Sequence, residues 1–156
     1  MVQVNAVKTR PDGLVHSVLV YFAKLNALVF KWTNGRFMNS VDGRPICLVT
    51  MLGAKSNQKR DIPLMFIPYN AGVILVASSG GSDHHPAWYY NLLHSPQIIV
   101  RAQGECLLLK ARLINSSERQ LVWPVCIDHY PRYQAYQQKT HREIPLFVCE
   151  PLTLSA

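Results

Sequence analysis

The chain has 156 residues, 49% hydrophobic and 16% charged, which fits one globular domain with a substantial core and excludes a disordered chain. Its net charge is +7, and the whole excess lies before Asp61, where Asp12 and Asp42 are the only acids. This surplus either attracts an anionic ligand or membrane surface, or is a solvated face that aids solubility. The sequence has no helix-turn-helix, RRM or zinc-finger pattern, so nucleic acid is not an expected partner.

Residues 14–32 form the first predicted helix. Its apolar residues recur at steps of three and four and so share one face: Val15, Val18, Phe22, Leu25, Val29 and Trp32. Lys24 and Asn26 interrupt the segment, which argues against a transmembrane span. The apolar face either closes the protein's own core or a homodimer interface, or lies on a membrane surface with its lysines toward the headgroups. We therefore divide the chain into an N-terminal amphipathic helix segment, 1–35, and a main domain, 36–156.

Apolar runs predict about six strands, at residues 44–52, 62–69, 73–77, 97–102, 106–114 and 144–149. Helices are expected from Pro86 to His94, from Ser117, where Ser-Glu-Arg-Gln has the capping-box spacing, and again after Pro131. Short connections between the strands indicate hairpins. The pattern favours a mainly β fold, a small antiparallel barrel with flanking helices.

The cysteines and histidines do not indicate a metal. None of Cys47, Cys106, Cys126 and Cys149 forms a C-x-x-C pair, so we expect reduced, buried thiols in a cytosolic protein. His84 and His85 adjoin each other without a cluster of further ligands. No uncharged stretch after the N-terminus suits a secretory signal, which also favours a cytoplasmic location.

Two loops are candidate ligand sites. Ser78-Ser79-Gly80-Gly81 follows an apolar strand and precedes the helix at Pro86. Such a loop cradles an anion or a cofactor, or is only a turn. Residues 55–60, Lys-Ser-Asn-Gln-Lys-Arg, connect two strands and either grip phosphate or carboxylate groups or form an ordinary basic turn.

Three tyrosines are candidate acceptor-site residues. Tyr130, Tyr133 and Tyr136 recur every third residue, which places them on neighbouring parts of one face. They either line an aromatic pocket and donate hydrogen bonds to a developing oxyanion, or are ordinary core or surface aromatics. The sequence has no nucleophile elbow, which argues against a serine hydrolase, and no Rossmann fingerprint, which argues against a nicotinamide enzyme. Its carboxylates are few, which argues against a two-carboxylate hydrolase.

Taken together, these motifs resemble the deazaflavin-dependent nitroreductase family of actinobacteria. The matching segments are Lys55-Ser56, Arg60 and Pro63-Leu64; Ser78-x-Gly80-Gly81; and His85-Pro86-Ala87-Trp88-Tyr89-x-Asn91-Leu92. The tail Tyr130-Pro131-x-Tyr133-x-x-Tyr136-x-x-x-Thr140-x-Arg142-x-Ile144-Pro145 resembles the same family. The match runs in one order from about Arg44 to Pro151.

The resemblance implies a split β-barrel of the FMN-binding type that binds the deazaflavin coenzyme F-420. It also implies hydride transfer from the reduced coenzyme to a quinone, such as menaquinone, or to a nitroaromatic compound. The coenzyme-binding residues it implies are Lys55, Arg60, Pro63, Ala77, Ser78, Ser79, Gly80, Gly81, Trp88 and Asn91. The catalytic, acceptor-side residues it implies are Tyr130, Tyr133, Tyr136 and Ser78.

Two loops depart from the family's pattern. Ala54 and Asn57 stand where the family's Gly-Arg-Lys-Ser-Gly loop has arginine and glycine, and Ser79 replaces the lysine of Ser-Lys-Gly-Gly. Both changes remove cations near the coenzyme's anionic tail. Two alternatives stay open: a split barrel that uses FMN, and a deazaflavin or lipid carrier without activity. A membrane-facing first helix would fit an acceptor dissolved in lipid, at the inner face of the cell membrane.

Overall fold

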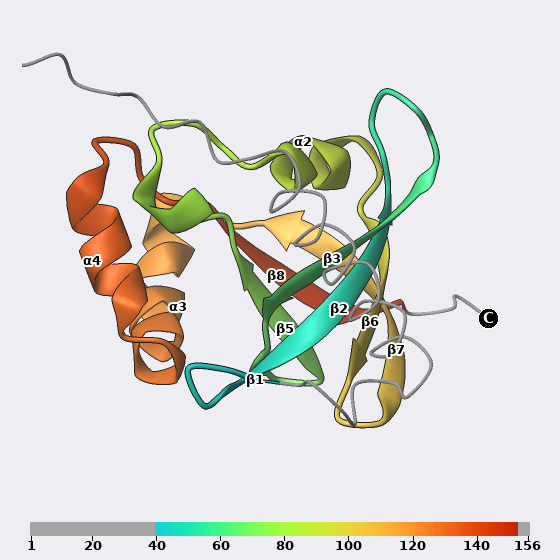
Figure 1. The fold of residues 1–156 in the computed structure, drawn as a ribbon, viewed down its shortest axis with the longest axis horizontal. Helices are drawn as coiled ribbons and strands as arrows, with labels where there is room; N and C mark the ends of the chain where they lie inside the picture. The colour runs from blue at the N-terminus through green and yellow to red at the C-terminus, as the bar shows by residue number, and fades with distance from the viewer. Residues whose placement is uncertain (1–39, 153–156) are drawn as a thin grey trace, which may run out of the picture.

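The computed structural model describes residues 40–152, which form a curled, mainly β sheet with helices at its edges (Figure 1). The predicted helix at 14–32 and the boundary after residue 35 lie outside the described residues. The strands are β1 Ser40–Val41, β2 Arg44–Leu52, β3 Lys59–Met65, β4 Ile67–Tyr69, β5 Gly72–Val76, β6 Gln97–Ala102, β7 Glu105–Leu113 and β8 Leu146–Pro151. The helices are a short 3-10 turn, η1 Ser79–Gly81, then α2 Ala87–His94, α3 Ser116–His129 and α4 Arg132–Lys139.

All the strand pairs are antiparallel, in the order β1-β2-β6-β7-β8-β5-β4, with β3 also paired to β2. The segment from β3 to β4 bends at Phe66, whose N–H still bonds to the Pro45 carbonyl at 2.9 Å. After the bend Ile67 pairs with Ile74 of β5. This bent segment therefore joins the two edges of the sheet, and the expected antiparallel split barrel is confirmed.

Alternate residues of the strands face two separate cores. Val73, Leu75 and Phe147 belong to the inner core of the barrel. Their neighbours Ile74, Val76, Leu146 and Val148 point the other way, into an outer core covered by α3 and α4. In Figure 1 these two helices lie together on one flank of the sheet, and α2 covers one end of it. The outer core contains Tyr130 and Tyr133, which places the predicted tyrosine series beneath the helices.

Several predicted boundaries were wrong for local reasons. The strand expected from residue 62 begins at Lys59, because residues 59–65 pair with β2 along their whole length, so Lys59 and Arg60 lie on a strand and not in a loop. Asn115, not Ser117, caps α3, with its Oδ1 accepting from the Glu118 N–H at 2.9 Å. Glu118 does not complete a capping box, since its carboxylate binds Arg112 at 2.7 and 2.8 Å.

The last strand also begins later than expected. It starts at Leu146, because the Ile144 N–H donates to the Gln137 side chain at 2.9 Å instead of to a strand. The expectation of buried thiols holds for Cys47, Cys126 and Cys149 but was wrong for Cys106, which is exposed. Burial raises the pKa of Cys47 and of Cys126 to about 12, so these thiols stay protonated and unreactive.

Candidate active site

A cavity of about 920 Å³ lies between the β2–β3 loop and α2, and we call it the cationic hollow. Lys55, Lys59 and Arg60 supply three positive charges to its wall, against the single carboxylate of Asp61. The other lining residues are Gly53, Ala54, Ser56, Ile62, His85, Ala87, Trp88, Tyr90 and Asn91. Four residues predicted to bind the coenzyme, Lys55, Arg60, Trp88 and Asn91, thus come together in one place. The excess of positive charge suits an anionic ligand.

The loop that carries Lys55 is held by its own backbone and by α2. The Asn57 N–H donates to the Gly53 carbonyl at 2.8 Å, and the Gly53 N–H to the Gln58 carbonyl at 2.9 Å. Asn57 has a φ of 51°, a left-handed conformation that asparagine tolerates, so it can replace the family's glycine here. Asn91 accepts from the Ala54 N–H at 2.9 Å. Asn91 therefore positions the loop by a bond to its backbone.

The glycine loop, residues 78–81, lies between β5 and α2, and its residues have different roles. Gly80 has a φ of 64°, and a Cβ there would meet no atom within 4 Å, so this face of the loop is open to a ligand. Gly81 is buried, and a Cβ there would lie 2.7 Å from the Tyr136 carbonyl oxygen, so close packing against α4 requires this glycine. The Ala77 side chain is fully buried in the inner core, and Ser79 is exposed.

Arg142 holds the glycine loop, a role that the sequence interpretation missed. Its guanidinium donates to the carbonyls of Ala77, Ser78 and Ser82 at 3.1, 3.0 and 2.8 Å. It also donates to His85 Nδ1 at 3.1 Å, which fixes the proton of the neutral ring on Nε2. Burial and the nearby Arg142 charge lower the pKa of His85. The only signal in the sequence was the place of Arg142 in the tail motif.

A second cavity, of about 300 Å³, contains the three tyrosines, and we call it the tyrosine pocket. Its other lining residues are Val41, Ile46, Pro63, Leu64, Met65, Val76, Ser78 and Gly80. Ser78 and Gly80 therefore face the tyrosines, and Pro63, which we predicted with the coenzyme set, lies on this wall as well. Strand β3 is shared by the two cavities, with Arg60 and Ile62 toward the hollow and Pro63 toward the pocket.

The rings of the three tyrosines form one cluster. Tyr130 and Tyr133 are edge to face with centroids 5.1 Å apart, and Tyr136 lies 6.3 and 6.2 Å from them. Tyr133 is 4% exposed, and burial raises its pKa, so its hydroxyl keeps its proton at any physiological pH. The Tyr133 hydroxyl has no hydrogen-bond partner among residues 40–152, although every fully buried polar side-chain atom there has one. This hydroxyl therefore opens onto the pocket, where it can donate to a ligand.

The β1–β2 hairpin is a second feature that the sequence interpretation missed. Asp42 and Gly43 form its turn with φ values of 51° and 71°, and Asp42 Oδ2 accepts from the Tyr130 hydroxyl at 3.3 Å. Arg132 Nη1 lies 3.2 Å from the same oxygen. The Asp-Gly pair was the available signal, since it is a common sequence for a two-residue hairpin turn.

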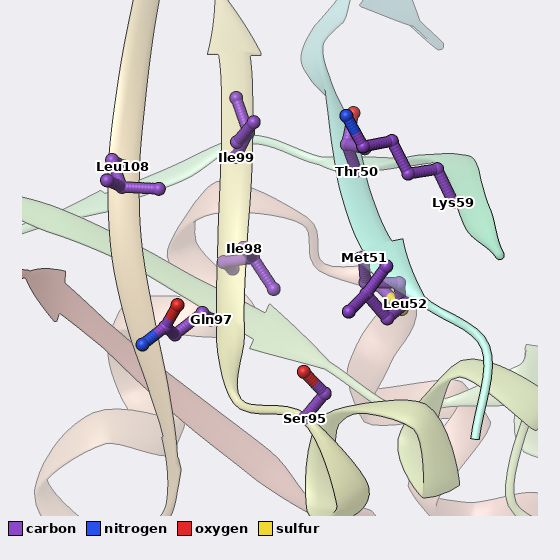
Figure 2. A pocket seen from close by; sticks show the side chains of 9 residues that line it. All are labelled: Thr50, Met51, Leu52, Lys59, Ser95, Gln97, Ile98, Ile99 and Leu108. Atoms are coloured by element: carbon purple, nitrogen blue, oxygen red, sulfur yellow. The ribbon is translucent and has the colours of Figure 1, made fainter. Parts of the chain in front are cut away.

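A third hollow, of about 240 Å³, lies on the outer side of β2, β6 and β7 (Figure 2). Thr50, Lys59, Ile99 and Leu108 lie toward one end of it and Ser95 at the other, with Met51, Leu52 and Ile98 between them. It contains no predicted site residue. In the part of the chain that the structure describes, no group of three or more His, Cys, Asp or Glu side chains could hold a metal ion.

Comparison with known proteins identifies the family of this chain. Residues 23–151 match the family described as F420H(2)-dependent quinone reductase. An F420H(2)-dependent quinone reductase of Mycobacterium tuberculosis is 28% identical over 139 residues, which cover 86% of this chain and 93% of that protein. A solved structure described as an F420-H2 dependent reductase is 42% identical, with a TM-score of 0.64, and covers 69% of this chain and 95% of its own. Another, described as a domain-swapped dimer, is 34% identical, with a TM-score of 0.67, and covers 85% and 99%. The chain belongs to the F420H(2)-dependent quinone reductase family, whose members are oxidoreductases that use reduced coenzyme F-420.

Proposed function

We propose that this chain reduces a lipophilic quinone, such as menaquinone, with a hydride from reduced coenzyme F-420. The observation that carries the proposal is the Tyr133 hydroxyl, a protonated donor in the tyrosine pocket that has no hydrogen-bond partner among residues 40–152. Reduction of a quinone places negative charge on its oxygen, and a fixed donor stabilises that charge most where water is excluded. The rest of the pocket wall is apolar, which suits an apolar quinone ring. Its apolar residues are Val41, Ile46, Leu64 and Val76.

The charge of the cationic hollow supports it as the coenzyme site. F-420 carries a phosphate and an acidic tail, and the hollow offers Lys55, Lys59 and Arg60 over about 920 Å³. Lys59 lines both the cationic hollow and the third hollow, and its side chain lies beside Thr50 in the latter (Figure 2). Lys55 and Arg60 are therefore the main cations for the coenzyme. The reduced coenzyme would supply the hydride. The open face of Gly80, which borders the tyrosine pocket, supports an approach of the two ligands at the Ser78–Gly81 loop.

The protein's own part in this reaction is to orient and to donate. Arg142 holds the Ser78 and Ala77 carbonyls, so the loop between the two cavities has one conformation. Tyr133 donates a hydrogen bond to the acceptor oxygen, and Ser78 offers a second hydroxyl on the same wall. A nitroaromatic acceptor develops negative charge on its oxygens in the same way, so we extend the proposal to such compounds as a second class of substrate.

The decisive experiment measures turnover and coenzyme preference with the full chain. We expect reduction of menadione by reduced F-420, and binding of F-420 in the micromolar range, about −8 kcal/mol, from quenching of tryptophan fluorescence. FMN should bind much more weakly, because the hollow offers cations for a longer acidic tail. Tighter binding of FMN would favour the alternative flavin enzyme. Binding of F-420 without any turnover would favour the carrier.

We also propose that residues 14–32 contact an anionic membrane surface or a second copy of the chain. Their apolar periodicity and the basic first part of the sequence support this. Among residues 40–152 no helix is long and apolar enough to cross a membrane. Sedimentation with anionic vesicles at low and high salt tests the membrane contact, with a chain lacking residues 1–35 as the control. Equal sedimentation of the two proteins would contradict it, and analytical ultracentrifugation of the same pair tests the dimer.

A further inference from the structure

The turn of the β1–β2 hairpin brings a carboxylate to the mouth of the tyrosine pocket. Val41 lines the pocket from β1, and Asp42 follows it directly. Both central residues of the turn have positive φ, which Asp and Gly tolerate, so this two-residue connection places the Asp42 side chain in a defined position. The Asp42 side chain is 45% exposed, so it lies where the pocket meets the solvent.

Within residues 40–152 Asp42 has two side-chain partners, and both come from the helical tail. Its Oδ2 accepts from the Tyr130 hydroxyl at 3.3 Å and lies 3.2 Å from Arg132 Nη1. The exposed ion pair with Arg132 contributes little by itself, because water screens both charges. The bond from Tyr130 is different in kind. Tyr130 is 7% exposed, so its ring is fixed in the outer core and its hydroxyl orientation decides which atoms face the pocket.

A tyrosine hydroxyl has one proton to donate and two lone pairs that accept. Tyr130 gives its proton to Asp42. The Tyr136 hydroxyl also forms a hydrogen bond with the Tyr130 hydroxyl, so with its proton on Asp42 the Tyr130 oxygen has only lone pairs to offer to Tyr136 and to the pocket. Tyr133 has no partner among residues 40–152 and keeps its proton for a ligand. Of the three phenols in the pocket, the bond to Asp42 makes Tyr130 an acceptor, Tyr133 is free to donate, and Tyr136 bonds to Tyr130. The carboxylate of Asp42 thus fixes the role of Tyr130.

We propose that Asp42 is a positioning residue of the acceptor pocket, which holds the Tyr130 hydroxyl so that Tyr130 accepts and Tyr133 donates when a quinone binds. This inference rests on the proposed function and names the residue that sets the polarity of its substrate site. Asp42 contacts neither substrate nor coenzyme in this scheme, and acts only through Tyr130.

The test compares two substitutions that keep the left-handed turn. Asp42→Gly removes the carboxylate, and Asp42→Asn removes its charge but keeps an oxygen that accepts from Tyr130. We expect Asp42→Gly to weaken menadione binding about fivefold, roughly 1 kcal/mol, measured by quenching of tryptophan fluorescence without coenzyme. Asp42→Asn should stay within about twofold of the parent, since the bond to Tyr130 survives.

The double variant shows whether Asp42 acts through Tyr130. In the Tyr130→Phe background Asp42→Gly should cause no further loss, because the bond is already gone. Gln103→Gly is the matched control: Gln103 occupies the β6–β7 turn with a φ of 52°, is exposed and lines none of the three cavities. It should bind menadione as the parent does.

Three outcomes would overturn the inference: Asp42→Asn as weak as Asp42→Gly, losses that multiply in the double variant, or an equal loss in Gln103→Gly. The proposed function has a separate readout. A parent that binds menadione with the expected dependence on Asp42 but never reduces it would contradict quinone reduction, and would support the positioning role of Asp42.

Discussion

The cationic hollow and the tyrosine pocket share strand β3 as a wall, but they bind by different physical means. The hollow is lined by long, solvated side chains, and Lys55, Lys59 and Arg60 are all exposed. The pocket is lined by packed rings, with Tyr130 and Tyr133 less than a tenth exposed. Charges in water act weakly and are screened by salt, whereas a single buried hydroxyl acts strongly. The hollow should therefore tolerate substitutions that the pocket does not.

The largest expected effect is at Tyr133. Tyr133→Phe removes the free hydroxyl and keeps the ring, so we expect turnover with menadione to fall on the order of 100-fold, while the affinity for F-420 is unchanged. Steady-state kinetics and a fluorescence titration measure the two quantities. Tyr69→Phe is the control, because Tyr69 is partly buried in the outer core but lines none of the three cavities. Full turnover in Tyr133→Phe, with loss in Tyr133→Ala, would mean that the ring only packs.

An intermediate effect is expected at Arg142, which lies between the two regions. Arg142→Ala leaves the Ala77, Ser78 and Ser82 carbonyls without their donor, so we expect the free energy of unfolding to fall by about 2 kcal/mol. Urea denaturation measures this loss. Arg112→Ala is a matched control, since it breaks a surface ion pair with Glu118 that should contribute less than about 1 kcal/mol. Equal losses in the two variants would refute the holding role of Arg142.

The smallest expected effect is at Arg60. Its side chain is exposed and bonds only weakly to Ser56 Oγ, at 3.3 Å, so Arg60→Ala should weaken F-420 binding by about 1 kcal/mol, near fivefold. The loss should shrink as salt is raised, because screening reduces the contribution of the intact residue. Lys110→Ala removes an exposed cation of β7 that lines none of the three cavities, and it should leave F-420 binding unchanged. If Arg60→Ala binds F-420 as tightly as the parent, the β2–β3 segment is an ordinary basic turn and does not bind the coenzyme.

Local signals predicted the framework well, and long-range contacts explain most of what they missed. The strand Arg44–Leu52, the helix after Pro86 and the hairpin of β6 and β7 follow from apolar runs, proline and glycine. Arg142 was not predicted as a loop-holding residue because its partners lie about 60 residues earlier in the chain. Asp42 was counted only as a charge, although the Asp-Gly turn could have been read locally.

The residues of the candidate site divide in the same way. Of the ten coenzyme residues that the motif resemblance implied, four line the cationic hollow: Lys55, Arg60, Trp88 and Asn91. Pro63, Ser78 and Gly80 of that set lie instead in the tyrosine pocket, together with the three predicted tyrosines. The resemblance could not show that Asn91 accepts a hydrogen bond from the backbone of the β2–β3 loop. That contact depends on how α2 packs against the loop, and no periodicity in the sequence encodes it.

The tight contact of Gly81 with α4 has a consequence for redesign. Because no side chain fits between residue 81 and the Tyr136 backbone, the Ser78–Gly81 loop and α4 pack directly against each other. A shift of α4 that widened the tyrosine pocket would therefore also displace the Ser78–Gly81 loop, which lines the same pocket. The β1–β2 hairpin has no such tether to the glycine loop among residues 40–152. An engineer who wants a bulkier acceptor should substitute Val41, which lines the pocket from that hairpin, and leave Asp42 and position 81 untouched.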